Sequence, residues 1–182
     1  MAVRHVVTVS EDNPILTAKA KRVRKVDASV QALIDDMVET MREAPGVGLA
    51  ATQIGVPLRV IVVEIPETED QPDSGKLYTL VNPEIIRTSD EIEEGEEGCL
   101  SIPGWIGQLD RHVWVTVKAL DRKGREVRIK ANDFLARTLQ HEIDHLNGVL
   151  FTDRLTSREK LIKLPEKEEE VEVSEARELA VA

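Results

Sequence analysis

The stretch NDFLARTLQHEIDHLNG, residues 132–148, decides the fold, because it reads as one helix that carries a metal-binding pattern. Asn132 or Asp133 offers an N-cap, and Gly148 stands where a glycine commonly ends a helix. Side chains four residues apart share a helical face, so His141 and His145 can bind one divalent ion.

Two neighbouring stripes of this helix are expected to face inward. The first consists of Phe134, Thr138, His141 and His145, and the second of Leu135, Leu139, Glu142 and Leu146. Glu142 lies off the face of the two histidines, from where its carboxylate can reach a water on the metal. The helix therefore predicts a metal site with its own base.

The third protein ligand has to come from elsewhere, and thiolate or imidazole suits a soft or borderline ion. The one cysteine, Cys99, lies in EGCLSIP, residues 97–103, which is predicted to be a short extended stretch or a tight loop. A motif of the type HExxHxxGxxH is incomplete, because Gly148 is present but Phe151 replaces the last histidine. By spacing alone Glu159 or Glu166 remains open, although the charged run from Glu166 is typical of a solvated segment.

A third segment, PGVGLAATQIG at residues 45–55, is rich in small residues and contains the neutral amide of Gln53 among apolar neighbours. Together with EGCLS, residues 97–101, and QHEIDH, residues 140–145, it resembles the three signature motifs of the peptide deformylases in order and separation. The similarity extends from about Val6 to Leu155 and covers most of the chain.

The resemblance implies a metal-dependent hydrolase that removes the formyl group from the N-terminal formylmethionine of newly made polypeptides. It implies metal ligands at Cys99, His141 and His145, a general acid/base at Glu142, and oxyanion contacts at Gln53 and Leu100. Such a site generates hydroxide at neutral pH, moves its proton through a carboxylate and stabilises the charge that develops on the carbonyl oxygen.

The methionine side chain requires an apolar slot, which the family builds from these same three segments. Its candidate residues are Gly46, Val47, Gly48, Phe134 and Thr138. At Gly95, Ile106 and Arg137 the chain departs from some relatives, so these positions are where its pocket is expected to differ. The alternative function is a related metal-dependent amidase that acts on another small N-acyl peptide.

The expected cofactor is one divalent ion, which the resemblance implies to be Fe²⁺, whereas Zn²⁺, Ni²⁺ or Co²⁺ suits the same ligands. Two further hypotheses stay open. One is a cysteine hydrolase with Cys99 as its nucleophile. The other is a structural metal site closed by four protein ligands, for which the chain offers no second cysteine and no suitably spaced third histidine.

Length and composition limit the number of domains, the kinds of partner and the cellular location that the protein can have. The 182 residues suit one domain, expected at residues 1–165, before an acidic tail at 166–182 that is disordered or helical. A net charge of −10 argues against a general nucleic-acid binder, although basic residues at 19–25 leave room for a transient ribosome contact. A single cysteine and the lack of a signal peptide or a long apolar run favour a cytoplasmic protein without a membrane segment.

The remaining patterns predict an α+β fold in which mainly antiparallel strands pack around the central metal-binding helix. Another helix is expected from Asp27 or Ser29 to Ala44. Strands are expected at residues 59–65, 78–81, 113–119 and 126–129, with a turn region at 66–75 and a short helix at 157–164. Arg111 is expected to pair with Glu97 and so to orient the cysteine segment.

Overall fold

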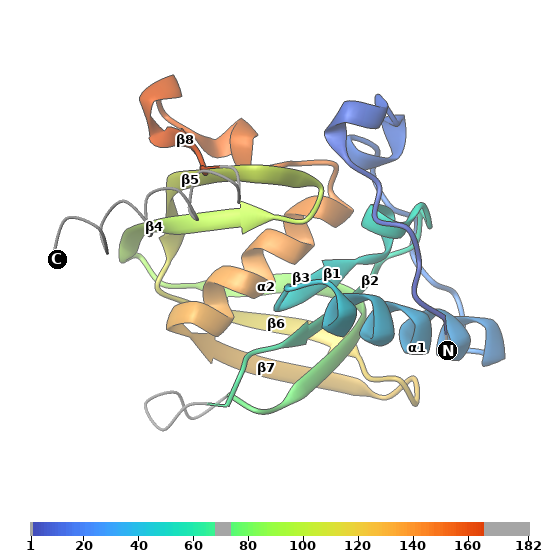
Figure 1. Ribbon diagram of the computed structural model, residues 1–182. Helices are drawn as coiled ribbons and strands as arrows, with labels where there is room; N and C mark the ends of the chain where they lie inside the picture. Colours follow the sequence, from blue (N-terminus) through green and yellow to red (C-terminus); the bar gives the residue numbers. More distant parts are fainter. Residues whose placement is uncertain (1, 68–73, 166–182) are drawn as a thin grey trace, which may run out of the picture.

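The computed structural model describes residues 2–67 and 74–165 (Figure 1). Helix α1 spans Ala28–Glu43 and helix α2 spans Asp133–Leu146. The strands are β1 Gly48–Ala50, β2 Val60–Glu64, β3 Leu77–Thr88, β4 Ile92–Cys99, β5 Ile102–His112, β6 Trp114–Leu120, β7 Glu126–Asn132 and β8 Leu161–Lys163. Short 3₁₀ turns lie at Val9–Glu11, Pro14–Leu16, Ala51–Ile54, Phe151–Arg154 and Arg158–Lys160.

The strands form two sheets, within which every neighbouring pair is antiparallel. The first has the order β1-β2-β3-β6-β7, and the second has the order β4-β5-β8. Figure 1 shows α2 running between the two sheets, with β4 and β5 on one side and β6 and β7 on the other. This arrangement confirms the predicted α+β class with a helix at the centre of antiparallel strands.

Strand β2 explains how both helices are held, because its side chains are buried on both faces. Ile61 and Val63 join the cluster that packs against Leu139 of α2. Val60 and Val62 point to the opposite face and pack with α1. A continuous apolar run is what a strand covered on both sides requires. The five-stranded sheet is therefore the wall against which the metal-binding helix rests.

Helix α1 begins where the sequence predicts. The Asp27 carboxylate accepts hydrogen bonds from the backbone N–H groups of Ser29 and Val30, which satisfies two donors that a helix start leaves free. The helix ends before Pro45. Its apolar stripe of Val30, Ile34 and Met37 is buried against the sheet, as the helical spacing of these residues predicts.

The structure corrects three expectations. Residues 157–164 do not form a helix: Arg158–Lys160 is one 3₁₀ turn, and β8 follows, because pairing with Trp105–Gly107 of β5 outweighs local propensity. The hairpin of β4 and β5 extends well beyond the short extended stretch predicted around Cys99. Phe134 is 39% exposed and does not face the core with the rest of its stripe.

The expected turn at 66–75 lies largely outside the described residues, and the acidic tail at 166–182 lies wholly outside them. Over residues 2–67 and 74–165, none of the helices has the length and apolar character that a membrane span requires.

Candidate metal centre

Helix α2 positions the two histidines. Asn132, with extended backbone angles, is its N-cap residue, and Asp133 contributes a negative charge to the first turn. The chain leaves the helix at Gly148, whose φ of +73° lies in the left-handed region. A Cβ at Gly148 would stand 2.3 Å from the carbonyl oxygen of Thr17, so only glycine fits there. These local constraints fix where α2 ends, one residue beyond the second histidine.

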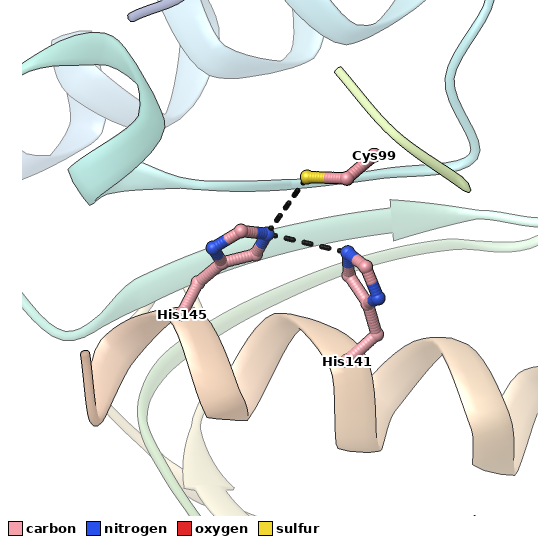
Figure 2. A group of neighbouring side chains, drawn as sticks. All are labelled: Cys99, His141 and His145. Carbon is pink, nitrogen blue, oxygen red and sulfur yellow. Dashed lines mark hydrogen bonds between the residues drawn. The ribbon is translucent and has the colours of Figure 1, made fainter. Parts of the chain in front are cut away.

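Cys99 is the last residue of β4, and the chain reverses over Leu100 and Ser101 into β5. The pairing register shifts between Gly98 and Cys99, which is a bulge at the end of the hairpin. Bulges redirect a side chain relative to the regular alternation of a strand. Here the thiol turns toward α2 (Figure 2).

Figure 2 shows the thiol and the two imidazoles pointing toward one another from β4 and α2. The Cys99 Sγ lies 3.2 Å from His145 Nε2, and that nitrogen lies 3.2 Å from His141 Nε2. All three ligand atoms fall within 4.8 Å of one another. One sulfur and two nitrogens converging on a point fit a divalent transition metal or zinc. The structure thus brings together the three residues that the sequence singled out as ligands.

Glu97 holds the first histidine in orientation. Its Oε2 lies 2.8 Å from His141 Nδ1, which leaves Nε2 directed at the other ligands. Carboxylates commonly hold a metal-binding imidazole in this way and fix its tautomer. The sequence did not indicate this contact; the only signal was that Glu97 and Cys99 share one motif.

Glu97 is itself held by two arginines. Arg111 donates two hydrogen bonds of 2.8 and 2.9 Å to the carboxylate, which confirms the predicted pair, and Arg137 adds one of 3.2 Å. Burial alone would raise the pKa of Glu97, but the hydrogen bonds from Arg111 and His141 lower it to about 2. Arg111 also reaches Asp144 of α2, so one guanidinium ties the cysteine hairpin to the metal-binding helix.

The two histidines differ in their electrostatics. Burial lowers the pKa of His145 well below its usual value, so this imidazole is neutral and able to ligate. Burial acts in the same direction on His141, but its interactions with Cys99 and Glu97 raise the pKa of that imidazole to about 10. The anionic surroundings of His141 favour a positive charge, which a bound cation provides in place of a proton.

Glu142 is buried beside the ligands, and among the described residues its Oε2 has no hydrogen-bond partner. Burial raises the pKa of this carboxyl to about 7. A buried carboxyl with a free oxygen and a pKa near neutrality is suited to accept and return a proton. These properties make Glu142 the candidate base beside the three candidate metal ligands.

Gln53 approaches the centre from the 3₁₀ turn Ala51–Ile54. Its Oε1 accepts a hydrogen bond of 2.8 Å from the Ala50 N–H, and its Nε2 lies 3.2 Å from Ser101 Oγ and 3.5 Å from Cys99 Sγ. The amide is thereby oriented with its N–H groups toward the cysteine. The contact with Ser101 is one that sequence reasoning did not foresee.

A cavity of about 730 Å³ opens onto these residues. The predicted substrate residues Gly46, Val47, Gly48, Phe134 and Thr138 all line it, together with Gln53, Leu100, Glu142 and two of the ligands, Cys99 and His141. His145 is buried and is not among the residues that line the cavity. Trp105 and Leu164, both partly exposed, also line it, and sequence reasoning missed Leu164.

Comparison with known proteins shows which family this chain is similar to. The family model described as polypeptide deformylase matches residues 3–161. Peptide deformylase of Thermomicrobium roseum is 54% identical over 171 residues, covering 93% of this chain and 96% of the relative.

Two solved structures illustrate the structural likeness. A crystal structure of peptide deformylase from Ehrlichia chaffeensis in complex with actinonin has a TM-score of 0.81 and 43% identity, covering 88% of this chain and 92% of that one. A Met-Ala-Ser bound structure of a class I type b peptide deformylase from Acinetobacter baumannii has a TM-score of 0.78 and 39% identity, with coverage of 85% and 99%.

Proposed function

This chain belongs to the polypeptide deformylase family, and we propose that it hydrolyses the formyl group of N-formylmethionyl polypeptides at the centre formed by Cys99, His141 and His145. The products are formate and a peptide with a free amino terminus. The observation that carries this proposal is the convergence of one thiol and two imidazoles within 4.8 Å, next to the buried carboxyl of Glu142.

We assign the ligand positions to Cys99, His141 and His145 and expect Fe²⁺ as the native ion, with Zn²⁺, Ni²⁺ or Co²⁺ able to replace it. When bound, a divalent ion supplies a Lewis acid and lowers the pKa of its water from about 15.7 to about 7. A thiolate and two imidazoles form a donor set of intermediate softness, which supports a late first-row metal over magnesium or calcium.

Glu142 is assigned as the group that moves the proton. Its carboxylate accepts the proton of the attacking water and then delivers it to the amide nitrogen as the bond to the formyl carbon breaks. A pKa raised to about 7 by burial supports both halves of this shuttle. Positioned acid/base groups of this kind typically contribute about 10²- to 10⁴-fold in rate.

Gln53 and Leu100 are assigned to the oxyanion. The side-chain Nε2 of Gln53 and the backbone N–H of Leu100 would donate to the formyl oxygen as negative charge develops on it. The bond from Ala50 N–H to Gln53 Oε1 holds the amide in the required orientation, which supports this role. Fixed donors cost no reorganisation at the moment of reaction.

The cavity accounts for the substrate class. Gly46, Val47, Gly48, Phe134 and Thr138 are assigned to substrate binding, and the apolar members suit a methionine side chain. The peptide beyond methionine has to leave toward solvent, and the partly exposed Trp105 and Leu164 lie on the cavity wall where apolar residues of that peptide would pack. The Met-Ala-Ser peptide bound by the relative from Acinetobacter baumannii supports a substrate of this length.

The cellular setting follows from the same chemistry. Formylmethionine begins newly made chains, so we place this activity in N-terminal methionine processing in the cytoplasm, with transient contact to the ribosome. Exposed basic residues along 19–25, namely Lys19, Lys21, Arg22, Arg24 and Lys25, would make that contact. Residues 1–165 are proposed as the catalytic domain, and the acidic tail at 166–182 as an appendage to it.

The decisive experiment measures formate release from formyl-Met-Ala-Ser by protein prepared anaerobically with ferrous iron, with Met-Ala-Ser as the blank. We expect release that a chelator abolishes and that added Fe²⁺ or Ni²⁺ restores. Release that survives complete metal removal would instead support a cysteine hydrolase. Glu142→Gln should keep the metal while losing most of the activity, whereas the exposed substitution Glu94→Gln should change neither.

A further inference from the structure

The N-terminal strap, residues 5–9, contacts two segments of the metal centre that are distant from each other in the sequence. The backbone N–H of Val7 donates to the carbonyl oxygen of Gln53 at 2.7 Å, and that of Val9 donates to the carbonyl oxygen of Ser101 at 2.9 Å. Gln53 lies in the 3₁₀ turn after β1, and Ser101 lies in the reversal between β4 and β5. In Figure 1 the strap is part of the dark blue segment beside α1. One stretch of chain therefore touches both segments that supply the proposed oxyanion donors.

A side-chain contact closes a ring between the strap and these two segments. Gln53 Nε2 donates to Ser101 Oγ at 3.2 Å. Together with the bonds from Val7 and Val9, this contact joins three separate parts of the chain in a closed circuit of hydrogen bonds. Gln53 and Ser101 are 2% and 0% exposed. Buried backbone carbonyl groups require hydrogen-bond partners, and the strap supplies one to each of these two residues.

The strap is itself fixed on both sides. The Glu11 carboxylate accepts a hydrogen bond of 2.9 Å from the backbone N–H of Thr8 and lies 3.0 Å from His5 Nε2. Toward α1, the backbone N–H of Arg4 donates to Thr40 Oγ1 at 2.9 Å. The first residues of a domain are poorly ordered unless contacts of this kind tie them down. The strap is therefore an ordered part of the fold, against which other groups can be positioned.

Both proposed oxyanion donors belong to the parts of the chain that the strap holds. The Leu100 N–H lies in the reversal beside Ser101, whose carbonyl oxygen accepts the bond from Val9. The Gln53 side chain is bonded to the N–H of Ala50 through its oxygen and to Ser101 through its nitrogen. Oxyanion donors are effective because they are fixed before the charge develops. A displacement of about 0.5 Å is enough to take a catalytic group out of its productive geometry.

We propose that the N-terminal strap is a positioning element for the reaction: through the N–H groups of Val7 and Val9 it holds the two oxyanion donors at the spacing that the reaction requires. This inference rests on the proposed deformylase function and on the oxyanion roles assigned there to Gln53 and Leu100. Neither valine lines the cavity, so the strap acts through the residues it holds and does not touch the substrate. Loss of one of its N–H groups should therefore lower turnover without weakening substrate binding.

Val9→Pro tests the inference at one hydrogen bond. Val9 is the first residue of a 3₁₀ turn, a position that suits proline and that Pro14 occupies in the next turn of this chain. Thr8 before it is extended, with φ −111° and ψ 158°, as the residue before a proline prefers. Val9 is 44% exposed, so the substitution removes little core packing. Proline has no N–H, and its ring carbon takes the place of the proton, so the strap loses its contact with Ser101.

Two comparison variants separate the hydrogen bond from other effects of the substitution. Val9→Ala shortens the side chain but keeps the N–H, so it should retain most of the turnover that Val9→Pro loses. Ala28→Pro is the matched proline control, because Ala28 is the exposed first residue of α1 and follows the extended Asp27. The N–H at this position has no partner within the helix, so proline removes no helical bond there. Ala28→Pro should leave kcat unchanged.

The assay measures formate release from formyl-Met-Ala-Ser, with kcat and KM determined separately and with metal content and Tm recorded for each protein. We expect Val9→Pro to lower kcat at least about fivefold, which is less than the roughly 10²- to 10³-fold that removal of a whole oxyanion donor costs. KM and metal content should stay at the values of the unmodified protein. In a Gln53→Ala background the loss caused by Val9→Pro should shrink, because effects that pass through one group are not additive.

An unchanged kcat in Val9→Pro, or an equal fall in Val9→Ala, would overturn the inference while leaving the deformylase function intact. A fall that comes with lost metal would overturn it as well, since the strap would then support the fold and not the donors. If Val9→Pro does not fold, Ser101→Ala decides, because it removes the oxygen that Gln53 Nε2 contacts and opens the same ring. Its kcat should fall with metal retained, and an unchanged kcat would overturn the inference. Failure of the unmodified protein to release formate is a different result, which refutes the proposed function itself.

Discussion

Gly48 lies directly against the carboxylate of Glu142, and the contact leaves no room for a side chain. A Cβ at Gly48 would stand 2.4 Å from Glu142 Oε1 and 2.9 Å from its carboxyl carbon. Gly48 begins β1, at the edge of the five-stranded sheet, so the backbone of that strand lies against the carboxylate of Glu142. Gly48, which the sequence analysis named as a candidate residue of the methionine slot, thus makes room for the carboxyl that we propose as the acid/base.

Gly48→Ala should therefore reduce kcat while leaving the metal bound. The added methyl displaces the Glu142 carboxylate, and we expect a loss of between about tenfold and the 10²- to 10⁴-fold that a general base contributes. Gly98→Ala is the comparison, because a Cβ there meets no atom closer than 3.6 Å. Equal losses in the two variants, measured by formate release at saturating substrate, would contradict the assignment.

Gln53→Ala removes one proposed oxyanion donor. Loss of such a donor typically costs about 10²- to 10³-fold in kcat, and we expect a value in this range with a smaller change in KM. Gln31→Ala, which removes an α1 amide bonded to Arg122 in the turn between β6 and β7, is the control and should be without effect on turnover. A change confined to KM in Gln53→Ala would assign the amide to ground-state binding instead.

Glu97→Gln tests the carboxylate that orients His141. The amide keeps the shape but loses the charge that faces Arg111, and we expect metal affinity to fall by about 10- to 100-fold. Breaking a buried pair of this kind also costs about 3–5 kcal/mol in the free energy of unfolding. Competition with a chromophoric chelator and urea denaturation measure the two effects. Because Arg111 keeps its ion pair with Asp144, the loss of unfolding free energy should lie at the lower end of this range.

Cys99→Ser should abolish tight metal retention, because a hydroxyl is a poor ligand for a late transition metal. Ligand binding to the folded state adds about 4 kcal/mol at a concentration a thousandfold above Kd, so added Ni²⁺ should raise the Tm of the unmodified protein. That increase should disappear in Cys99→Ser and persist in His5→Ala, which removes an exposed histidine. Retention of the shift in Cys99→Ser would exclude the thiol as a ligand.

Gly148→Ala should destabilise the fold more than Gly55→Ala. Both glycines have positive φ angles, of +73° and +79°, so each alanine carries a backbone cost of about 1–2 kcal/mol. At Gly55 a Cβ meets nothing within 4 Å, whereas at Gly148 it would overlap the backbone of Thr17. Denaturant titration should show the larger loss of unfolding free energy for Gly148→Ala. Equal losses would mean that the N-terminal segment moves aside freely.

Several elements could be predicted because their determinants are local. Helix α2 has Asn132 before its first turn, Gly148 after its last turn and apolar residues at helical spacing between them, and its two histidines share a face through helix geometry alone. Strand β2 could be predicted from its continuous run of apolar residues, whose side chains are buried on both faces of the sheet. In such segments the residues that interact are also close in the sequence, so the local spacing of apolar and polar residues is enough to predict the element.

The hairpin of β4 and β5 and the edge strand β8 were not predicted, because their formation depends on partners that are distant in the sequence. Strand β4 contains four glutamates and two glycines, residues that are depleted in strands, and it forms because β5 supplies its partners. Strand β8 follows a charged 3₁₀ turn and owes its extended form to β5 as well. Pairing partners distant in the chain do not appear in the local pattern.

The sequence by itself indicated the chemistry, because two histidines at helical spacing beside a glutamate predict a metal site with a base, and because the three short motifs resemble those of the peptide deformylases. Only the tertiary structure decided how that chemistry is held. The bulge at Cys99, the carboxylate of Glu97 on His141 and the glycine beside Glu142 each depend on contacts between separate elements. Such contacts form only when the sheets close around α2, since packing, and not local propensity, sets the distances between side chains.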